Sequence, residues 1–228
     1  MTGTSQDQVA LVVRSIARTV VENEKYFGDL DAVVGDGDFG YSLARGFEKV
    51  LEGWDDFDRS DSGAFLKKVG VTITSRMGGT SGPIWGTAFL RAGAAAGDGE
   101  IDGATVVAML RAAVEGIKAR GRSDVGDKTL LDTLVPVTDR IEQEVGSGAD
   151  SAAVVAAVAQ TAKSSAEATS DMVARRGRAS YTGERSRGSV DAGAMALAVI
   201  AEQLSRAWVG RDEPGATTTN ENDQGVTL

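Results

Sequence analysis

The chain contains no cysteine and no histidine among its 228 residues. Without cysteine it has no disulfide framework, no thiolate nucleophile and no zinc site of the usual kind. Without histidine it has no imidazole base, no histidine metal ligand and no residue that can carry a phosphohistidine. Any chemistry must therefore rest on carboxylates, lysine, arginine, hydroxyl groups and the backbone.

Basic stretches and long apolar runs are also missing. The formal net charge is −9 and the pI is near 4.7, which argues against the broad basic surface that a nucleic-acid partner requires. No segment approaches the roughly 18 apolar residues of a membrane span, and the N-terminus has no basic region followed by an apolar core. We therefore expect a cytoplasmic protein with neither a nucleic-acid nor a membrane partner.

Helical periodicity dominates what is present. Apolar residues recur every three or four positions, as in Val9, Val12 and Ile16. The alternating stretch 69–75 looks like a strand, but its flanks offer no partner strand or hairpin turn. We predict an all-α fold of eight helices, at 6–27, 41–51, 62–76, 83–96, 103–120, 129–145, 151–175 and 191–208. We expect residues 1–208 to form one domain and the polar residues 209–228 a disordered tail.

The segment between the first two predicted helices carries three aspartates. Asp31, Asp36 and Asp38 lie within eight residues of LDAVVGDGDFG, with glycines between them. Three carboxylates on a chain that can turn sharply suit Mg²⁺, which prefers oxygen ligands and is often shared with substrate phosphates. The spacing excludes an EF-hand. Helix caps and turn aspartates have the same composition, so this segment alone leaves both interpretations open.

Two further segments combine glycine with hydroxyl or charged residues. GGTSGP places Thr80 and Ser81 before a predicted helix, where free amides favour an anion, although an ordinary helix cap has the same composition. GDKTLLD nearly spells a P-loop, but Asp127 separates Gly126 from Lys128 and a helix rather than a strand precedes it. The P-loop interpretation is therefore rejected.

The last of the four segments, ARRGRASYTGERSRGSVDAGA, gathers five arginines in an otherwise acidic chain. Guanidinium groups suit phosphate oxygens, although a solvated basic loop has the same composition. If the helices alternate up and down, the segments after predicted helices one, three, five and seven lie at one end of the bundle. These are the four segments just described. A site for a magnesium-bound nucleotide predicts this ordering, whereas turn composition does not.

Four motifs in this order resemble the nucleotide-binding L subunit of the dihydroxyacetone kinase family: LDAVVGDGDFG, GGTSGPIWGTAFL, GDKTLLD and GRASYTGERSRGSVDAGA. The resemblance covers residues 5–208 and implies an antiparallel eight-helix barrel with a nucleotide and two Mg²⁺ ions at one rim. It implies that Asp31, Asp36 and Asp38 are catalytic metal ligands, and we expect Arg178 to steady the transferred charge. The residues expected to contact ADP or ATP are Phe39, Gly40, Tyr41, Ser42, Thr80, Ser81, Gly121, Leu130, Arg178, Asp191, Ala192 and Gly193.

The resemblance implies a kinase subunit, a phosphotransferase with an alcohol acceptor, that acts on dihydroxyacetone or a related short ketose. A partner, the substrate-binding kinase subunit, would hold this acceptor, because this chain has no histidine to capture a carbonyl. The donor stays open: free ATP, or a retained ADP recharged by a phosphohistidine carrier protein. The sequence also leaves open a nucleotide-sensing regulatory module without its own turnover, and the formation of a homodimer.

Two positions depart from the family pattern. Members driven by a phosphoenolpyruvate relay typically read GDxDHG, and Phe39 replaces the histidine here. The usual DPG before the last helix is Asp191, Ala192 and Gly193, which keeps the cap and loses a rigid turn. The motif GERSRG resembles the relay-type subunits, so these departures leave the donor undecided.

Overall fold

The computed structural model describes residues 4–79 and 81–210, and within these ranges it contains α-helices and short 3₁₀ helices but no strand. The predicted all-α fold is confirmed, including the helical conformation of residues 69–75. The α-helices are α1 (Ser5–Glu22), α2 (Glu24–Ala32), α3 (Phe39–Glu52), α4 (Ser62–Arg76), α5 (Ser81–Ala96), α6 (Gly103–Gly121), α7 (Leu131–Ser147), α8 (Ser151–Ala168) and α9 (Ala192–Gly210). The 3₁₀ helices are Trp54–Asp56, Thr169–Asp171 and Arg178–Ser186.

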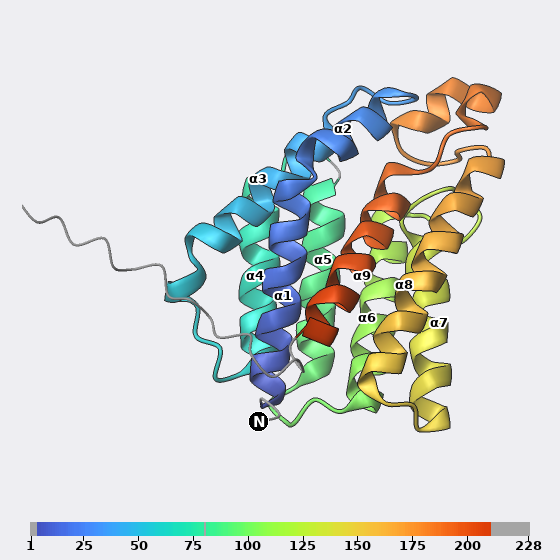
Figure 1. Ribbon diagram of the computed structural model, residues 1–228. Helices are drawn as coiled ribbons and strands as arrows, with labels where there is room; N and C mark the ends of the chain where they lie inside the picture. Colours follow the sequence, from blue (N-terminus) through green and yellow to red (C-terminus); the bar gives the residue numbers. More distant parts are fainter. Residues whose placement is uncertain (1–3, 80, 211–228) are drawn as a thin grey trace, which may run out of the picture.

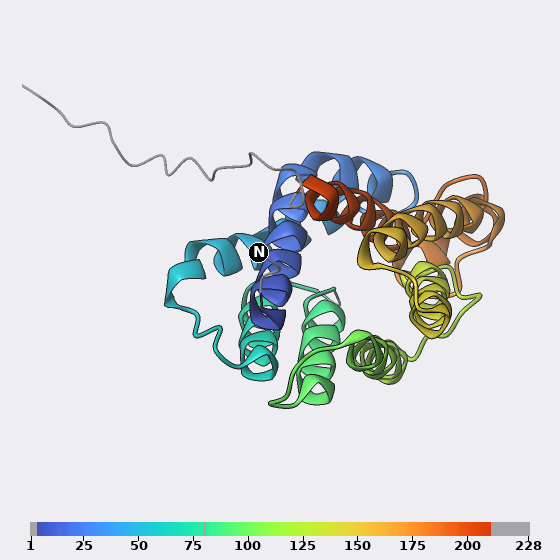
Figure 2. The same cartoon turned by 60° about the horizontal axis from the view of Figure 1, so that its bottom comes forward.

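The long helices form a closed ring. Helix α1 packs on α3, each helix from α3 to α9 packs on the next one, and α9 packs back on α1. Figure 1 shows the neighbours running alternately up and down, and Figure 2 shows the ring from its lower end. The short helix α2 stands outside this cycle and packs across α3 and α9. The antiparallel eight-helix barrel is therefore the architecture of the chain, with α2 as an addition.

Apolar side chains fill the ring. On α1 the buried residues Val13, Ala17 and Val20 follow helical spacing and face the main core cluster. Phe47 of α3 makes edge-to-face contacts with Trp85 of α5, with ring centroids 6.1 Å apart. No helix in the described residues is long and apolar enough to cross a membrane.

The prediction of one helix over 6–27 is wrong, because α1 stops before Asn23 and α2 continues past Gly28. Asn23 leaves the helical conformation, with φ −107° and ψ 16°, and this ends α1. Its side-chain amide donates to the carbonyl of Thr19 at 2.8 Å. Gly28 lies inside α2 instead of ending a helix, and α3 packs closely on this part of α2 through its own Gly40. A Cβ on Gly40 of α3 would lie 2.0 Å from an α2 carbonyl oxygen and 2.5 Å from the Gly28 nitrogen. As a result Asp31 sits on the last turn of α2.

The predicted helix over 151–175 is also too long, because α8 ends at 168. The buried hydroxyl of Thr169 donates to the carbonyl of Ala166 at 2.6 Å and accepts from the amide of Asp191 at 2.8 Å. This contact turns the chain into a long connection, residues 172–190, which we call the arginine loop. The other predicted helices agree with the structure to within two residues at each end. The predicted tail falls almost entirely outside the described residues.

Candidate functional site

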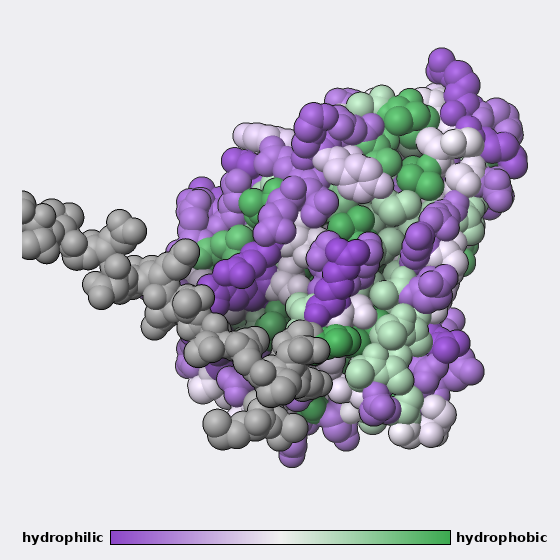
Figure 3. All heavy atoms as spheres, in the orientation of Figure 1, coloured by the Kyte–Doolittle hydropathy of each residue, from purple (hydrophilic) through white to green (hydrophobic). Residues whose placement is uncertain are grey.

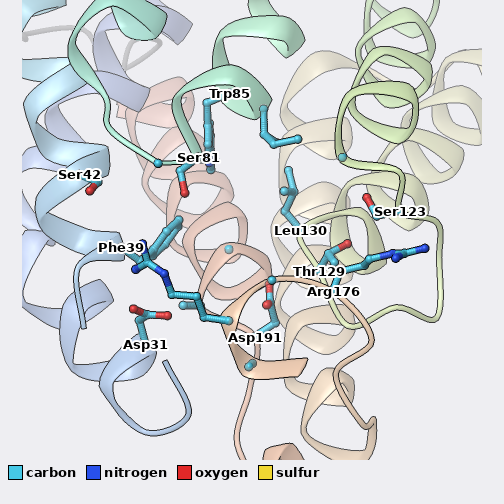
Figure 4. Close-up of a pocket in the computed structure, with 18 of the residues that line it drawn as sticks. Asp31, Phe39, Ser42, Ser81, Trp85, Ser123, Thr129, Leu130, Arg176 and Asp191 are labelled. Atoms are coloured by element: carbon cyan, nitrogen blue, oxygen red, sulfur yellow. The ribbon is translucent and has the colours of Figure 1, made fainter. Parts of the chain in front are cut away.

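The four glycine-rich segments meet at one end of the ring, as the alternation of helices predicts. Together they enclose a cavity of about 610 Å³, a size typical of small-molecule sites. Its walls come from the end of α2, the starts of α3 and α5, the α6–α7 loop and the arginine loop. Figure 4 shows side chains from these elements around one space. In Figure 3, hydrophilic side chains predominate where the arginine loop projects, and hydrophobic side chains lie beside them at the same end of the molecule.

Three carboxylates lie together at one side of this cavity. Asp31, Asp36 and Asp38, which we call the acidic cluster, each offer a carboxylate oxygen, and these oxygens all lie within 4.8 Å of one another. The amide of Gly37 donates to Asp31 at 2.9 Å, which fixes its carboxylate. A Cβ on Gly35 would lie 2.3 Å from Oδ1 of Asp31, so the loop folds back this closely only because residue 35 is glycine.

Arg178 of the arginine loop places its guanidinium against the acidic cluster. Its Nη1 lies 2.6 Å from a carboxylate oxygen of Asp38 and also pairs with Asp36. These two carboxylates raise the pKa of Arg178. Desolvation tends to raise the pKa of Asp36, but the hydrogen bond and charge of Arg178 outweigh it and the pKa falls below its ordinary value. The pKa of Asp31 is instead raised by burial, against the opposing amides of Phe39 and Gly37.

Helices α3, α5, α7 and α9 all begin at this rim, where Phe39, Ser81, Leu130 and Ala192 line the cavity. The free amides and the dipole of a helix N-terminus both favour negative charge. The arginine loop adds positive charge to the same walls. The site thus combines an acidic cluster, which suits cations, with groups that suit anions. A cation-bound polyphosphate carries both kinds of charge.

An apolar wall adjoins the polar groups. Pro83, Ile84 and Trp85 from the first turns of α5 line the cavity, together with Ile117 of α6 and Leu130. Apolar walls with a few polar groups are typical of sites that hold a flat organic ring. The cavity therefore has room and chemistry for more than a phosphate group.

Most of the predicted site residues lie at this cavity. Asp36 belongs to the acidic cluster without lining the cavity, and Thr80 lies outside the described residues. Gly40 and Tyr41 do not line it: Gly40 is buried against α2, and Tyr41 is 58% exposed, with the Arg45 guanidinium 4.9 Å from its ring. Predicted residues that line the cavity are Asp31, Asp38, Phe39, Ser42, Ser81, Gly121, Leu130, Arg178, Asp191, Ala192 and Gly193.

Several lining residues were not predicted. Ile84 and Trp85 follow the GGTSGP segment by helical spacing, and the first turn of any helix that begins at a site is a candidate wall. Ser123, Lys128 and Arg176 lie in segments that the sequence singles out, but composition does not show which of their residues face the cavity.

The half-buried carboxyl of Asp191 makes stability depend on pH. It caps α9 by accepting from the amide of Ala194 at 2.7 Å. Burial raises its pKa from 3.8 to about 7, with Asp132 adding to the rise and Lys128 opposing it. Between these values the folded chain binds a proton that the unfolded chain has released. The stability that Asp191 contributes therefore falls as the pH rises from 4 to 7 and is constant above that.

Asp191→Asn keeps an acceptor for the cap but cannot ionise. We expect it to gain stability over the wild type as the pH rises from 4 to 7, by at most about 4 kcal/mol for three pKa units. Solvent in the cavity reduces this upper value. Urea unfolding of both chains across this range measures the difference, and a difference that does not change with pH would contradict the assignment.

The fold and site define a helical barrel with a polar cavity at one rim, where an acidic cluster meets helix N-termini and arginines. Residues 33–206 match the model of the DAK2 domain, and the chain belongs to this family. The family resemblance of the four motifs is thereby confirmed.

Relatives include both separate subunits and longer kinases. The chain is 38% identical over 181 residues to the ADP-binding subunit DhaL of PEP-dependent dihydroxyacetone kinase 1 from Listeria innocua, which covers 79% of this chain and 86% of the relative. It is 37% identical over 184 residues to the corresponding Escherichia coli subunit, covering 80% and 88%. D-erythrulose kinase from Mycolicibacterium smegmatis is 33% identical over 200 residues, which cover 86% of this chain but 34% of that kinase.

Among solved structures, the chain resembles the dihydroxyacetone kinase of C. freundii in complex with AMP-PNP and Mg²⁺. The TM-score is 0.71 at 25% identity, and the match covers 88% of this chain and 34% of that one. The native form of the same kinase gives a TM-score of 0.72. The fold described here thus also occurs as one part of a longer kinase.

Proposed function

We propose that the chain is the magnesium–nucleotide-binding subunit of a two-component kinase that phosphorylates dihydroxyacetone or a related short ketose. One observation carries the proposal: segments remote in sequence bring the acidic cluster, four helix N-termini and Arg178 to a single cavity. The names of the relatives support it, since they include ADP-binding subunits of dihydroxyacetone kinases. A related structure holds AMP-PNP and Mg²⁺.

The acidic cluster fits a hard divalent cation. Its oxygen donors lie within 4.8 Å of one another, and two of its carboxylates already pair with a guanidinium cation. We propose that Asp31, Asp36 and Asp38 hold two Mg²⁺ ions together with the nucleotide phosphates. When bound, magnesium neutralises charge on the phosphate oxygens during transfer.

The remaining wall residues suit the other parts of a nucleotide. Amides at the start of α5 and α9 would donate to phosphate oxygens, and Ile84 and Leu130 would offer an apolar surface to the base. Arg178 stands beside the acidic cluster, where its guanidinium would donate to the phosphoryl group as charge develops. The ketose would be held by the partner subunit, which approaches the rim.

A reconstituted reaction tests this function. The purified chain, a substrate-binding kinase subunit, dihydroxyacetone and Mg-ATP should give steady formation of the phosphorylated ketose. Turnover that instead requires phosphoenolpyruvate and a phosphohistidine carrier would identify bound ADP as the acceptor of that relay. If neither donor gives product while nucleotide alters binding to the partner, the regulatory interpretation replaces the kinase. If calorimetry detects no binding of Mg-ADP, both are wrong.

Gly35→Ala tests the geometry of the acidic cluster. The new methyl group would lie 2.3 Å from Oδ1 of Asp31 and must displace that carboxylate. We expect Mg-ADP affinity to fall at least about tenfold, as expected when the supports of a metal site are disturbed. Gly146→Ala is the matched control, because its Cβ meets nothing within 4 Å. Calorimetry measures the Mg-ADP affinity of both variants. Equal affinities would show that binding does not depend on the observed position of the Asp31 carboxylate.

A further inference from the structure

Lys128 has an unusual environment for a lysine. Only 2% of the residue is exposed, and its φ of 62° is one of two positive values at non-glycine residues in the described parts of the chain. Lysine is rarely buried without partners, and side chains with a Cβ rarely adopt this conformation. Such strained residues persist where their surroundings hold them, and they gather at functional sites.

The ammonium group of Lys128 joins the two ends of the arginine loop. Its Nζ donates to the carbonyl of Met172 at the start of the loop, at 3.2 Å, and to the carbonyl of Ser189 at its end, at 2.7 Å. It also donates to the carbonyl of Ser186. These three bonds use all three ammonium protons, so none is left for a ligand in the cavity. The role of Lys128 is therefore exerted on the loop.

Asp127, the preceding residue, holds the inner part of the same loop. Its carbonyl accepts from the amide of Arg175 at 3.0 Å, and its carboxylate lies 3.5 Å from Nε of Arg176. Two residues further along the chain, Arg178 reaches the acidic cluster. A short path of backbone thus connects the bonds of Lys128 and Asp127 with the guanidinium at the site.

We propose that Lys128 is a positioning residue that holds the arginine loop so that Arg178 stands at the acidic cluster. It closes the base of the loop at Met172, Ser186 and Ser189, and it leaves the cavity side free for ligands. This inference rests on the proposed function for its kinetic consequence. The anchoring of the loop is independent of any reaction and can be measured separately.

Limited trypsin digestion of the full chain measures the anchoring. Lys128→Met removes the three charged bonds and leaves buried carbonyls without donors. We expect cleavage within the arginine loop, identified by mass spectrometry, to become at least about tenfold faster, as expected when a loop opens more readily. Lys128→Arg, which keeps several charged donors, should restore at least part of the resistance. Unchanged loop cleavage in Lys128→Met would overturn the proposal.

Lys118→Met is the matched control for the loss of a lysine. Lys118 lies on α6 and pairs with Asp124 of the α6–α7 loop at 2.8 Å. Within the described residues its ion pairs are with Glu115 and Asp124 and not with the arginine loop, so the cleavage pattern of this variant should equal that of the wild type. Faster loop cleavage in this variant as well would overturn the assignment to Lys128.

A double-mutant cycle in the reconstituted kinase tests the link to Arg178. Lys128→Met should lower kcat at least about tenfold in the wild-type background and less than about twofold in an Arg178→Ala background, because coupled residues are not additive. Equal effects in both backgrounds would overturn the proposal. If the wild type neither binds Mg-ADP nor turns over, the proposed function fails, while the digestion still decides whether Lys128 anchors the loop.

Hydrogen exchange in the wild type covers the case in which Lys128→Met does not fold. The amide of Ala174 donates to the hydroxyl of Ser186 at 2.9 Å, and the amide of Gly188 donates to the carbonyl of Ser170 at 2.8 Å. In a loop held at its base, both amides should exchange as slowly as those of α9. Exchange at the rate of an unstructured chain would overturn the proposal.

Discussion

Asp36→Asn is expected to abolish measurable phosphoryl transfer and to weaken Mg-ADP binding at least about 100-fold. The variant removes one of three clustered carboxylates and also a charged partner of Arg178. Loss of outer partners around a metal site already costs about 10- to 100-fold, and loss of a direct ligand costs at least as much. Calorimetry with Mg-ADP and the reconstituted transfer reaction measure the two effects.

Asp29→Asn on α2, the helix that precedes the loop of Asp36, provides the control. Asp29 is exposed on α2 and pairs with Lys25 at 2.5 Å, an ion pair of the surface type that contributes little to stability. Its loss should leave both nucleotide binding and transfer unchanged. Unaltered Mg-ADP binding by Asp36→Asn would contradict the metal site proposed for the acidic cluster.

The barrel can be predicted from the sequence because the residue pattern within each helix specifies that helix and its buried face. Each long helix carries its own apolar stripe, and in an up-and-down bundle consecutive helices run antiparallel. Residues such as Val13, Ala17 and Val20 therefore predict both the helix and the face that it buries. The alternation of helices then predicts that four segments lie at one rim, and this prediction needs no knowledge of the contacts between them. The structure confirms it.

The two wrong helix ends depend on contacts between distant parts of the chain. Gly28 reads as a helix stop, but it lies inside α2, whose backbone α3 approaches closely at Gly40. Thr169 reads as an ordinary helix residue, but its hydroxyl binds the amide of Asp191, 22 residues later. Propensity is a weak guide when tertiary contacts of this kind decide where a helix ends.

In the site, the sequence predicts which residues gather at the rim but not which way their side chains point. Composition identifies the aspartates and arginines that belong to the rim. It does not show which side chains at the rim point into the cavity. Arg178 reaches the acidic cluster, whereas Tyr41 faces away and packs with Arg45. Lys128 looks like part of a failed P-loop in the sequence, whereas its position under the arginine loop follows only from the fold.

Arg178→Ala is expected to lower kcat about 1,000-fold or more without weakening the binding of Mg-ADP. An arginine that stabilises the charge of a transferred phosphoryl group accounts for about 10³- to 10⁵-fold in kcat. The same guanidinium pairs with Asp36 and Asp38, so its removal frees carboxylate oxygens for the cation. Transfer and binding should therefore respond in opposite directions, which general damage to the site would not produce.

Arg178→Lys separates charge from geometry, because lysine keeps the charge and loses the planar, bidentate donor arrangement. It should recover only part of the lost kcat. Arg185→Ala is the matched control, since Arg185 is exposed in the same loop and does not line the cavity. If Arg185→Ala and Arg178→Ala reduce kcat equally, the loop acts through its overall positive charge. If only Arg178→Ala lowers kcat, the effect depends on the contact of Arg178 with the acidic cluster, because that contact distinguishes the two arginines.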